Sequence, residues 1–555
     1  MSSAGNALIS VFDKTGIEEF ALGLHKLGWQ IYASGGTYKA ITKTDIPTKD
    51  ISELVGGGAI LGHKVVTLSR EIAAGLLADT TNKKEMAEME RLSLPVFHMV
   101  CQDSYPLEQE IIKEDSTPES VLDQTDIGGP TMLREAAKGR RIVLSVPDQR
   151  QQVLEWLQEG RPGEKEFIKG LTARAVYEVA RYSMLEAKYW NGRHISGSLA
   201  TKFMPIKYGE NPEQQDAALY SDNRVDVDPL GIDQFKLVQG NKSGFVNITD
   251  MDRLLQTITH IAAGFERNFG EVPAIAVGVK HGNACGAAEG QNLVEAVKKM
   301  LTGDVRAIFG GLVMVNGIID KDVARALLNH GTENNKSRFL VGVVGGDATK
   351  EALEILGSKK FSVYINPALG NLGEGSLDNT RIIRQIRGGI LEQPNYTFVQ
   401  DLASEHMQHH GKLTNQQKRD LILAWAVGST SNSNTITLAR DGQLIGNGVG
   451  QQDRVGASQL ALTRTTTEAS NLEVNENEII ITIKLDRKKL NGAAAYSDSF
   501  FPFPDGPELL AKAGIKAILI SSGSIKDKEV IKTLKDKGVS VSMVPDKVGR
   551  GFYAH

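Results

Sequence analysis

The chain has 555 residues, too many for one hydrophobic core, so two or more domains are expected. Its hydrophobic content of 41%, charged content of 23% and formal net charge of −4 are those of an ordinary globular enzyme and give no reason to expect nucleic-acid binding. Two cysteines, Cys101 and Cys285, exclude a disulfide framework and predict a reducing compartment such as the cytoplasm, and neither a signal-like start nor a membrane-spanning apolar run is found.

The first part of the chain alternates between predicted strands and helices. The predicted strands are residues 7–11, 30–33, 96–101 and 140–146. A long helix is expected at 171–190, followed by a linker at 191–198. This alternation predicts a parallel sheet with ligands bound at the carboxyl ends of its strands.

Two polar turns at neighbouring strand ends form a candidate anion site. Ser34, Gly35, Gly36 and Thr37 offer backbone N–H groups, two hydroxyls and a helix N-terminus, and Lys14 from the preceding turn adds a charge. One such loop is more often a plain turn with a helix cap. Two of them at adjacent strand ends favour a phosphate group.

Further along, the buried-strand pattern of residues 273–277 leads to Lys280, His281 and a glycine. A cation beside a group that titrates near neutrality suits proton transfer, although an isolated pair of this kind is more often an exposed lysine next to a structural histidine. The glycines of 446–451 resemble a dinucleotide fingerprint only superficially. Residues 463–477 are expected to be a surface insertion, and 515–544 a closing βαβ unit.

A set of motifs, in order along nearly the whole chain, resembles one enzyme family. The motifs are Asp13-Lys14-Thr15-Gly16, Ser34-Gly35-Gly36-Thr37, Asp126-Ile127-Gly128-Gly129-Pro130-Thr131, Tyr208-Gly209 with Asn211-Pro212, Lys280-His281 and Ser497-Asp498-Ser499-Phe500-Phe501-Pro502-Phe503. They are similar to those of the bifunctional purine biosynthesis enzymes that join AICAR transformylase to IMP cyclohydrolase. No single motif is decisive, but the ordered set is highly specific.

The resemblance implies an α/β protein with two functional parts. Residues 1–197 are expected to form a methylglyoxal-synthase-like parallel-sheet domain that closes the purine ring. Residues 198–555 are expected to form two cytidine-deaminase-like subdomains that transfer a formyl group. The co-substrate is then 10-formyltetrahydrofolate, and the expected assembly is a homodimer whose transformylase sites are completed across the interface.

The same resemblance assigns roles in formyl transfer. His281 is expected to take the proton of the attacking amino group, Lys280 to stabilise the oxyanion, and Asn434 to fix the formyl oxygen. The expected binding positions for the transformylase substrates are Lys207, Tyr208, Asn247, Phe309, Gly310, Gln451, Arg454, Arg550 and Phe552. Lys207 stands where the family usually has arginine, so the charge is kept and the bidentate fork is lost.

For ring closure, Tyr105, Asp126 and Lys138 match catalytic positions of the family, and the anion-site residues match its phosphate-binding positions. The family's catalytic lysine does not have a match. Val66 occupies its place before Thr67-Leu68, and valine carries no charge and donates no side-chain hydrogen bond. Lys64, a candidate binding residue, lies two positions before Val66 and can substitute only if the backbone shifts.

Phe12 departs from the family as well, because it replaces a small polar residue of the first loop. The alternatives are therefore a transformylase whose first domain binds nucleotide but closes the ring weakly or not at all, and a non-catalytic purine-nucleotide sensor. A methylglyoxal synthase would leave most of the chain unexplained. A zinc deaminase is excluded by motif, since Cys285 has no cysteine two or three residues away.

Overall fold

The structure is a computed structural model that describes residues 4–61, 65–222, 227–332, 337–357, 360–465, 471–474, 479–482 and 485–553. The described chain up to Ala200, with Asp222, forms one compact unit, and Thr201–Ser221 with the described residues from 227 onward forms a second. Each unit has its own hydrophobic core. None of the helices in the described ranges is long and apolar enough to span a membrane.

The first unit is built on a five-stranded sheet with strand order β3-β2-β1-β4-β5. Its strands are β1 (Gly5–Val11), β2 (Trp29–Ala33), β3 (Thr48–Asp50), β4 (Met99–Asp103) and β5 (Ile142–Leu144). All neighbouring pairs are parallel, as predicted, and Val11 of β1 lies opposite Asp103 of β4. The loops that follow β1 and β4 therefore meet at one edge of the sheet.

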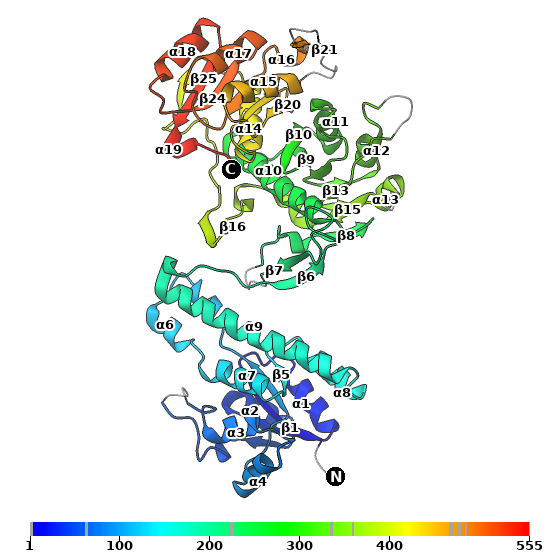
Figure 1. Ribbon diagram of the computed structural model, residues 1–555, viewed down its shortest axis with the longest axis vertical. Coiled ribbons are helices and arrows are strands. Elements are labelled where there is room, and N and C mark those ends of the chain that lie inside the picture. Colours follow the sequence, from blue (N-terminus) through cyan, green and yellow to red (C-terminus); the bar gives the residue numbers. More distant parts are fainter. Residues whose placement is uncertain are drawn as a thin grey trace. The chain divides into compact units, whose positions relative to one another are not determined.

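Helices surround this sheet (Figure 1). They are α1 (Ile17–Lys26), α2 (Gly35–Thr42), α3 (Arg70–Leu77), α4 (Lys83–Arg91), α5 (Leu107–Ile111), α6 (Pro118–Asp123), α7 (Gly128–Lys138), α8 (Gln149–Gln158) and α9 (Glu164–Asn191). The long helix α9 packs against α7 and β5. It begins before the predicted residue 171 because its first two turns are mostly exposed and lack the apolar stripe used for the prediction.

The second unit contains a twelve-stranded sheet made of two halves with the same strand pattern. The first half holds β8 (Lys236–Gln239), β9 (Ala274–Lys280), β10 (Asn283–Gly290), β11 (Leu312–Val315), β13 (Gly342–Gly345) and β15 (Ser362–Ile365). The second holds β18 (Gln408–His410), β19 (Ile436–Arg440), β20 (Gln443–Gly448), β23 (Ala494–Ser497), β24 (Ala517–Ser522) and β25 (Ser540–Pro545).

In each half a hairpin is followed in the sheet by a third strand that is antiparallel to its neighbour in the hairpin. Two more strands run parallel to this third strand, and a last strand pairs antiparallel at the edge of the sheet. The hairpins are β9–β10 and β19–β20, and the halves join where β10 pairs with β20. The predicted closing βαβ unit is confirmed as β24, α18 (Asp527–Asp536) and β25, whose strands are parallel.

Helices cover both faces of this sheet. On one face α10 (Phe245–Phe269) and α14 (Asn415–Ser429) pack on each other and on strands of both halves. The opposite face is covered by α11 (Leu293–Gly303), α12 (Lys321–Asn329) and α13 (Lys350–Leu356) in the first half, and by α15 (Arg454–Arg464), α17 (Asp505–Ala513) and α18 in the second. Adjacent strand residues accordingly enter different cores, as Ala276 and Val277 do.

The remaining elements are short. They are the strand pairs β6 (Thr201–Pro205) with β7 (Ala218–Ser221), β12 (Ile318–Ile319) with β14 (Asp347–Ala348), β16 (Arg381–Ile386) with β17 (Gly389–Pro394) and β21 (Asn471–Val474) with β22 (Ile479–Thr482), and the helices α16 (Arg487–Leu490) and α19 (Asp546–Gly549). The insertion expected at 463–477 thus begins in α15 and includes β21, and its other residues lie mostly outside the described ranges.

Candidate active sites

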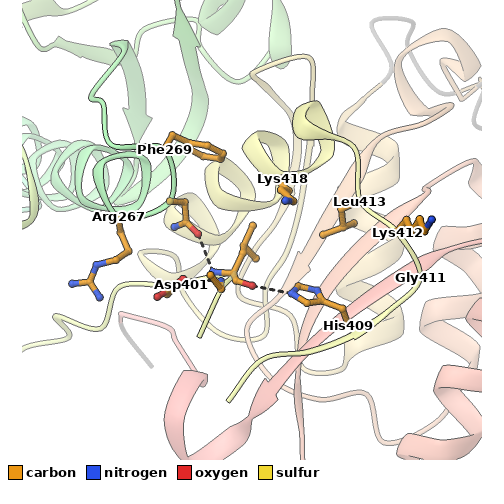
Figure 2. Close-up of a pocket in the computed structure, with 11 residues that line it drawn as sticks. Arg267, Phe269, Asp401, His409, Gly411, Lys412, Leu413 and Lys418 are labelled. Carbon is orange, nitrogen blue, oxygen red and sulfur yellow. Dashed lines mark hydrogen bonds between the residues drawn. The ribbon is translucent and has the colours of Figure 1, made fainter. Parts of the chain in front are cut away.

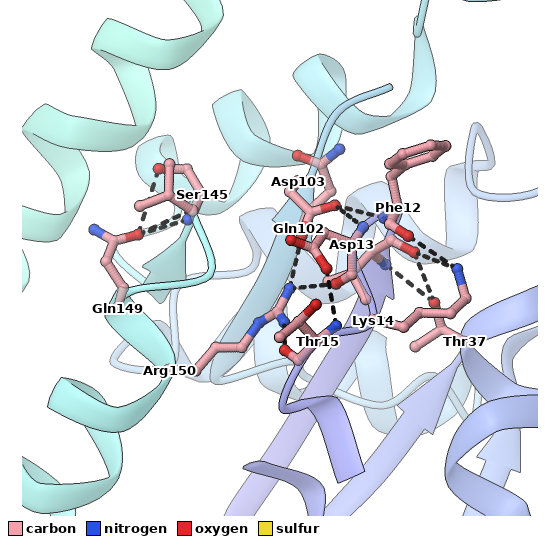
Figure 3. A network of polar contacts seen from close by, with 12 residues as sticks. Phe12, Asp13, Lys14, Thr15, Thr37, Gln102, Asp103, Ser145, Gln149 and Arg150 are labelled. Atoms are coloured by element: carbon pink, nitrogen blue, oxygen red, sulfur yellow. Dashed lines mark hydrogen bonds and ion pairs between the residues drawn. The ribbon is translucent and has the colours of Figure 1, made fainter. Parts of the chain in front are cut away.

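A buried ion pair holds the loop that follows β1 (Figure 3). Asp103, the last residue of β4, accepts hydrogen bonds on Oδ1 from the backbone N–H groups of Phe12 (2.5 Å) and Asp13 (3.0 Å). Arg150 donates from Nη2 to Asp103 Oδ2 (2.7 Å) and to the Asp13 carbonyl, and from Nη1 to the Thr15 carbonyl (2.5 Å). The Arg150 side chain is only 6% exposed, so a buried guanidinium holds the backbone of this loop in place.

The predicted anion-site residues lie together on this loop and on the start of α2. Lys14 Nζ donates to the carbonyl oxygens of Val11 (3.2 Å) and Phe12 (3.1 Å), and its stem passes close to Gly36. Thr37 Oγ1 accepts a hydrogen bond from the Val11 backbone N–H and donates one to the Val11 carbonyl.

Gly35 and Gly36 lie in the first turn of α2. Ser34, the residue before the helix, makes no side-chain cap with it, and its Oγ is instead 2.7 Å from Ser10 Oγ. The first N–H groups of α2 therefore have no capping side chain. A cation beside an uncapped helix start is an arrangement that binds phosphate.

A second group of polar residues lies where β4 and α7 meet. Asp126 accepts hydrogen bonds from the Gly129 backbone N–H (2.9 Å) and from Gln102 Nε2 (3.3 Å). Burial raises the pKa of the Asp126 carboxyl, and backbone N–H groups including that of Tyr105 oppose the rise. Burial and the nearby Asp126 raise the pKa of the Tyr105 phenol. A phenol that keeps its proton beside a carboxylate can donate a hydrogen bond to a substrate.

Lys138 is not brought into this group. It is the exposed last residue of α7, whose first residue, Gly128, lies next to Asp126. A helix rises about 1.5 Å per residue, so the two ends are separated by about 15 Å along the axis. Lys64 lies outside the described residues.

The segment that carries Val66 does reach the site. Thr67 Oγ1 lies so close to Gly128 that a side chain at residue 128 would contact it. Val66 itself is half-buried and packs against the hydrophobic core of the first unit. The position of the expected catalytic lysine therefore presents an apolar side chain that is used in packing.

In the second unit, Lys280 and His281 lie at the turn of the β9–β10 hairpin, at a strand end as predicted. His281 has φ 52° and Gly282 has φ 70°, the pair of positive values that two-residue hairpin turns require. The Gly282 N–H donates to Asp250 Oδ1 on α10 at 2.7 Å. Burial raises the pKa of Asp250, and the N–H groups of Gly282 and His281 oppose the rise.

The second half of the sheet repeats this turn without the site residues. Asp441 and Gly442 at the β19–β20 turn have φ 52° and 73°, and the Gly442 N–H donates to Asp420 Oδ1 at 2.8 Å. Asp250 and Asp420 occupy the same place, the sixth residue, in α10 and α14. The aspartate-held hairpin turn that carries His281 is therefore a structural feature of both halves, and only the first half has the candidate catalytic residues on it.

Lys280 and His281 both line a cavity of about 430 Å³ between the β9–β10 and β19–β20 hairpins. Lys280 Nζ donates to the Phe309 carbonyl oxygen at 2.7 Å, which places Phe309 and the adjoining Gly310 beside the pair. Cys285 lines the same cavity, and burial raises the pKa of its thiol to about 12, so the thiol is neutral. Asp304, Arg306 and Arg464 also line the cavity, so it contains several charged groups and an imidazole but no thiolate.

Asn434 belongs to a polar cluster next to this cavity. Its Nδ2 donates to the Gln451 carbonyl (2.9 Å), and Arg454 Nη1 donates to its Oδ1 (2.7 Å). Arg454 also binds the buried Asp498 (3.1 Å), which accepts a further hydrogen bond from Ser433 Oγ (2.6 Å). Burial raises the pKa of Asp498, whereas the Arg454 guanidinium lowers it.

Backbone contacts join this cluster to the cavity and to the chain end. The Asn432 N–H donates to the side chain of Asn283, which lines the cavity (3.3 Å). Phe552 lies between Gly551 and Tyr553, whose N–H groups donate to the carbonyls of Asp498 (3.3 Å) and Ser431 (3.1 Å).

The other predicted binding residues lie at three further places. Asn247 is in the first turn of α10, one turn before the aspartate that holds the His281 turn. Arg550 pairs with Asp546 at 2.5 Å. Lys207 lies over the Tyr208 ring, 5.7 Å from its centroid, in the loop after β6. Neither Lys207 nor Tyr208 is among the described residues that line the cavity.

Four supporting residues were not predicted as site residues. Asp103 follows the strand predicted at 96–101, and Asp498 lies within the Ser497–Phe503 motif, so the sequence offered a signal for both carboxylates. Arg150 and Asp250 lie inside helices and are recognised only by their contacts, because no spacing links them to the loops that they hold.

A further cavity of about 430 Å³ in the second unit is unrelated to these residues (Figure 2). Arg267, Phe269, Asp401 and Lys418 are among the residues that line it. Its histidine, His409, has both ring nitrogens engaged, Nε2 with the Leu402 carbonyl (2.8 Å) and Nδ1 with a serine hydroxyl (2.9 Å). None of the predicted site residues that the structure describes lines this cavity.

Known proteins resemble the chain along nearly its whole length. The family described as "AICARFT/IMPCHase bienzyme" matches residues 136–464, and the "MGS-like domain" matches residues 16–131, which confirms the expected fold class. Proteins described as "Bifunctional purine biosynthesis protein PurH" from Bacillus cereus (strain AH187) and Bacillus thuringiensis subsp. konkukian (strain 97-27) are each 32% identical over 543 residues, 96% of this chain and 97% of theirs. A solved structure titled "Crystal structure of ForH" is 30% identical, covers 34% of this chain and 100% of its own, and has a TM-score of 0.30.

Proposed function

Because this chain belongs to the AICARFT/IMPCHase bienzyme family of purine biosynthesis, we propose that it transfers the formyl group of 10-formyltetrahydrofolate to AICAR. The product is FAICAR, which the first unit then closes to IMP. The transformylase part is residues 198–555 and the cyclohydrolase-like part is residues 1–197. The observation that carries formyl transfer is the single cavity lined by both Lys280 and His281.

The chemistry of formyl transfer explains this pair. The 5-amino group of AICAR is a poor nucleophile because its lone pair is delocalised into the imidazole and carboxamide. A neutral His281 takes the proton of this amino group as it attacks the formyl carbon. Lys280, oriented by the Phe309 carbonyl, stabilises the oxyanion and helps to protonate the departing folate nitrogen. Asn434, oriented by Arg454, fixes the formyl oxygen.

The first unit supports ring closure less fully. Lys14 and the start of α2 suit the phosphate of FAICAR, and Tyr105 and Asp126 lie together at the same sheet edge. Val66, however, packs into the core and supplies no donor. This observation favours a second candidate function, in which the first unit binds IMP or FAICAR but closes the ring slowly or not at all.

One assay tests the proposal and separates its alternatives. Purified protein is mixed with AICAR and 10-formyltetrahydrofolate, and FAICAR and IMP are measured. Formation of both supports the bifunctional enzyme, and FAICAR alone supports a transformylase with a degenerate first unit. Binding of purine nucleotide with neither product supports the non-catalytic sensor and contradicts the proposal.

We expect chelators to leave formyl transfer unchanged. No Cys-x-x-Cys pair occurs in the sequence, and no group of three or more metal-binding side chains is gathered among the residues that the structure describes. The measurement is FAICAR formation before and after dialysis against EDTA, with metal analysis of the same samples. Stoichiometric zinc whose removal abolishes activity would contradict this expectation.

We expect a homodimer in solution, and this expectation derives from the family alone. Lys207 and Tyr208 are not among the described residues that line the Lys280–His281 cavity. Sedimentation at micromolar concentration measures the assembly, and formyl transfer is assayed at the same concentrations. A fully active monomer would show that one chain contains a complete site.

A further inference from the structure

Two half-exposed aromatic rings meet at the edge of the first unit's sheet. Phe12 follows β1 and Tyr105 follows β4, and these strands are parallel neighbours. The ring centroids are 5.7 Å apart and the ring planes make an angle of 86°, the edge-to-face geometry in which one ring's positive edge meets the other's negative face. The exposed fractions are 47% for Phe12 and 42% for Tyr105, so this contact is a surface feature of the candidate site and not part of the core.

The two rings are held unequally. The backbone N–H of Phe12 donates to Asp103, which is locked in turn by the buried Arg150. The backbone at Phe12 is therefore held by the Asp103–Arg150 ion pair. Tyr105 lies on the loop between β4 and α5, and its backbone N–H interacts with Asp126. Its ring contacts the ring of Phe12.

We propose that Phe12 is a positioning residue that holds the Tyr105 phenol over the candidate ring-closure site. This inference rests on the proposed cyclohydrolase function. A small polar side chain at residue 12 could not make an edge-to-face contact with Tyr105. Val66 offers no hydrogen-bond donor to the FAICAR oxygen that gains charge during ring closure. The Tyr105 hydroxyl beside Asp126 is then the donor for this oxygen, so the orientation of the hydroxyl matters more.

The first test replaces Phe12 and measures the single-turnover rate from FAICAR to IMP. Phe12→Ser removes the ring contact and is expected to lower this rate about three- to tenfold, the scale of one aromatic pair. Phe12→Tyr keeps the ring and is expected to stay within about twofold of the parent. IMP affinity, measured by calorimetry, is expected to change little in both variants, because the anion-binding loop is held through the Asp103 and Arg150 contacts with its backbone.

A double-mutant cycle separates positioning from a general effect on the loop. Tyr105→Phe keeps the ring and removes the hydroxyl that Phe12 is proposed to orient. In this background Phe12→Ser is expected to cost no further rate. An equal loss in both backgrounds, or weakened IMP binding that accounts for the loss, would overturn the proposal. Leu92→Ser, another exposed apolar residue (41%) in the same unit, is the matched control and is expected to leave the rate unchanged.

If the parent protein does not close the ring, the proposed function is refuted, but the Phe12–Tyr105 contact can still be tested by a measurement that needs no turnover. The ultraviolet titration of Tyr105 is isolated by subtracting the curve of Tyr105→Phe from that of the parent. Burial is the main cause of the raised pKa of this phenol, so Phe12→Ser is expected to shift its titration to lower pH. An unchanged titration would show that Phe12 does not hold the ring and would overturn the inference.

Discussion

Replacing His281 with alanine is expected to lower the kcat of FAICAR formation at least about a hundredfold, the usual scale for loss of a general base. The imidazole lines the same cavity as Lys280, and in the proposed reaction it accepts the proton of an amino group that attacks poorly because its lone pair is delocalised. Folate and AICAR are expected to bind with little change, so the loss should appear in kcat more than in KM.

The repeated sheet provides a matched control for this variant. Asp441 occupies the corresponding turn position in the second half, with the same φ of 52°, so alanine there introduces similar backbone strain without removing a site residue. Asp441→Ala is expected to keep nearly normal turnover. If His281→Ala also retained nearly normal turnover, His281 would not be the base, and equal losses in the two variants would trace the effect to the turn itself.

The sequence was sufficient for features that depend on local pattern. The buried run before Lys280 predicts a strand that ends there, and β9 ends at Lys280. The parallel sheet of the first unit follows from the alternation of strands and helices in the same way. These predictions succeed because hydrophobic period and turn chemistry are encoded within a few neighbouring residues.

Features that depend on distant contacts were not predictable. Arg150 lies far along the chain from the loop that it fixes, and no pattern connects an arginine in α8 with the residues after β1. The two halves of the second unit share strand order and the Asp250 and Asp420 contacts, yet His281 and Asp441 occupy equivalent turns with different side chains. Lys138 lies at the opposite end of α7 from Gly128, and its catalytic role stays a prediction.

Replacing Val66 with lysine is expected to speed ring closure by up to about a hundredfold. Ring closure joins the carboxamide nitrogen of FAICAR to its formyl carbon and expels water. Both groups belong to one molecule, so binding in the cyclic conformation already supplies much of the rate. What remains is to stabilise the oxygen that gains charge, and losing one charged donor for such an oxygen typically costs about 3–4 kcal/mol.

The structure sets conditions on this gain. Val66 is half-buried against the core, but the next residue, Thr67, lies against the start of α7 near Asp126. A lysine stem can follow the core edge in place of valine while its ammonium group reaches the site, as long cationic side chains commonly do. The first unit should lose some stability, because the new side chain packs less well than valine. Thermal unfolding of the parent and the variant measures this loss independently of the rate.

The deciding measurement is the single-turnover rate from FAICAR to IMP in the parent, Val66→Lys and two controls. Val66→Met lengthens the side chain without charge, and Val65→Lys places the charge one residue away from the expected catalytic position. Only Val66→Lys is expected to gain rate. A fast parent with no gain in Val66→Lys would mean that another group, such as Lys64, already serves the oxygen. A slow parent rescued only by Val66→Lys would show that the first unit has kept the binding geometry of a cyclohydrolase while lacking its charged donor.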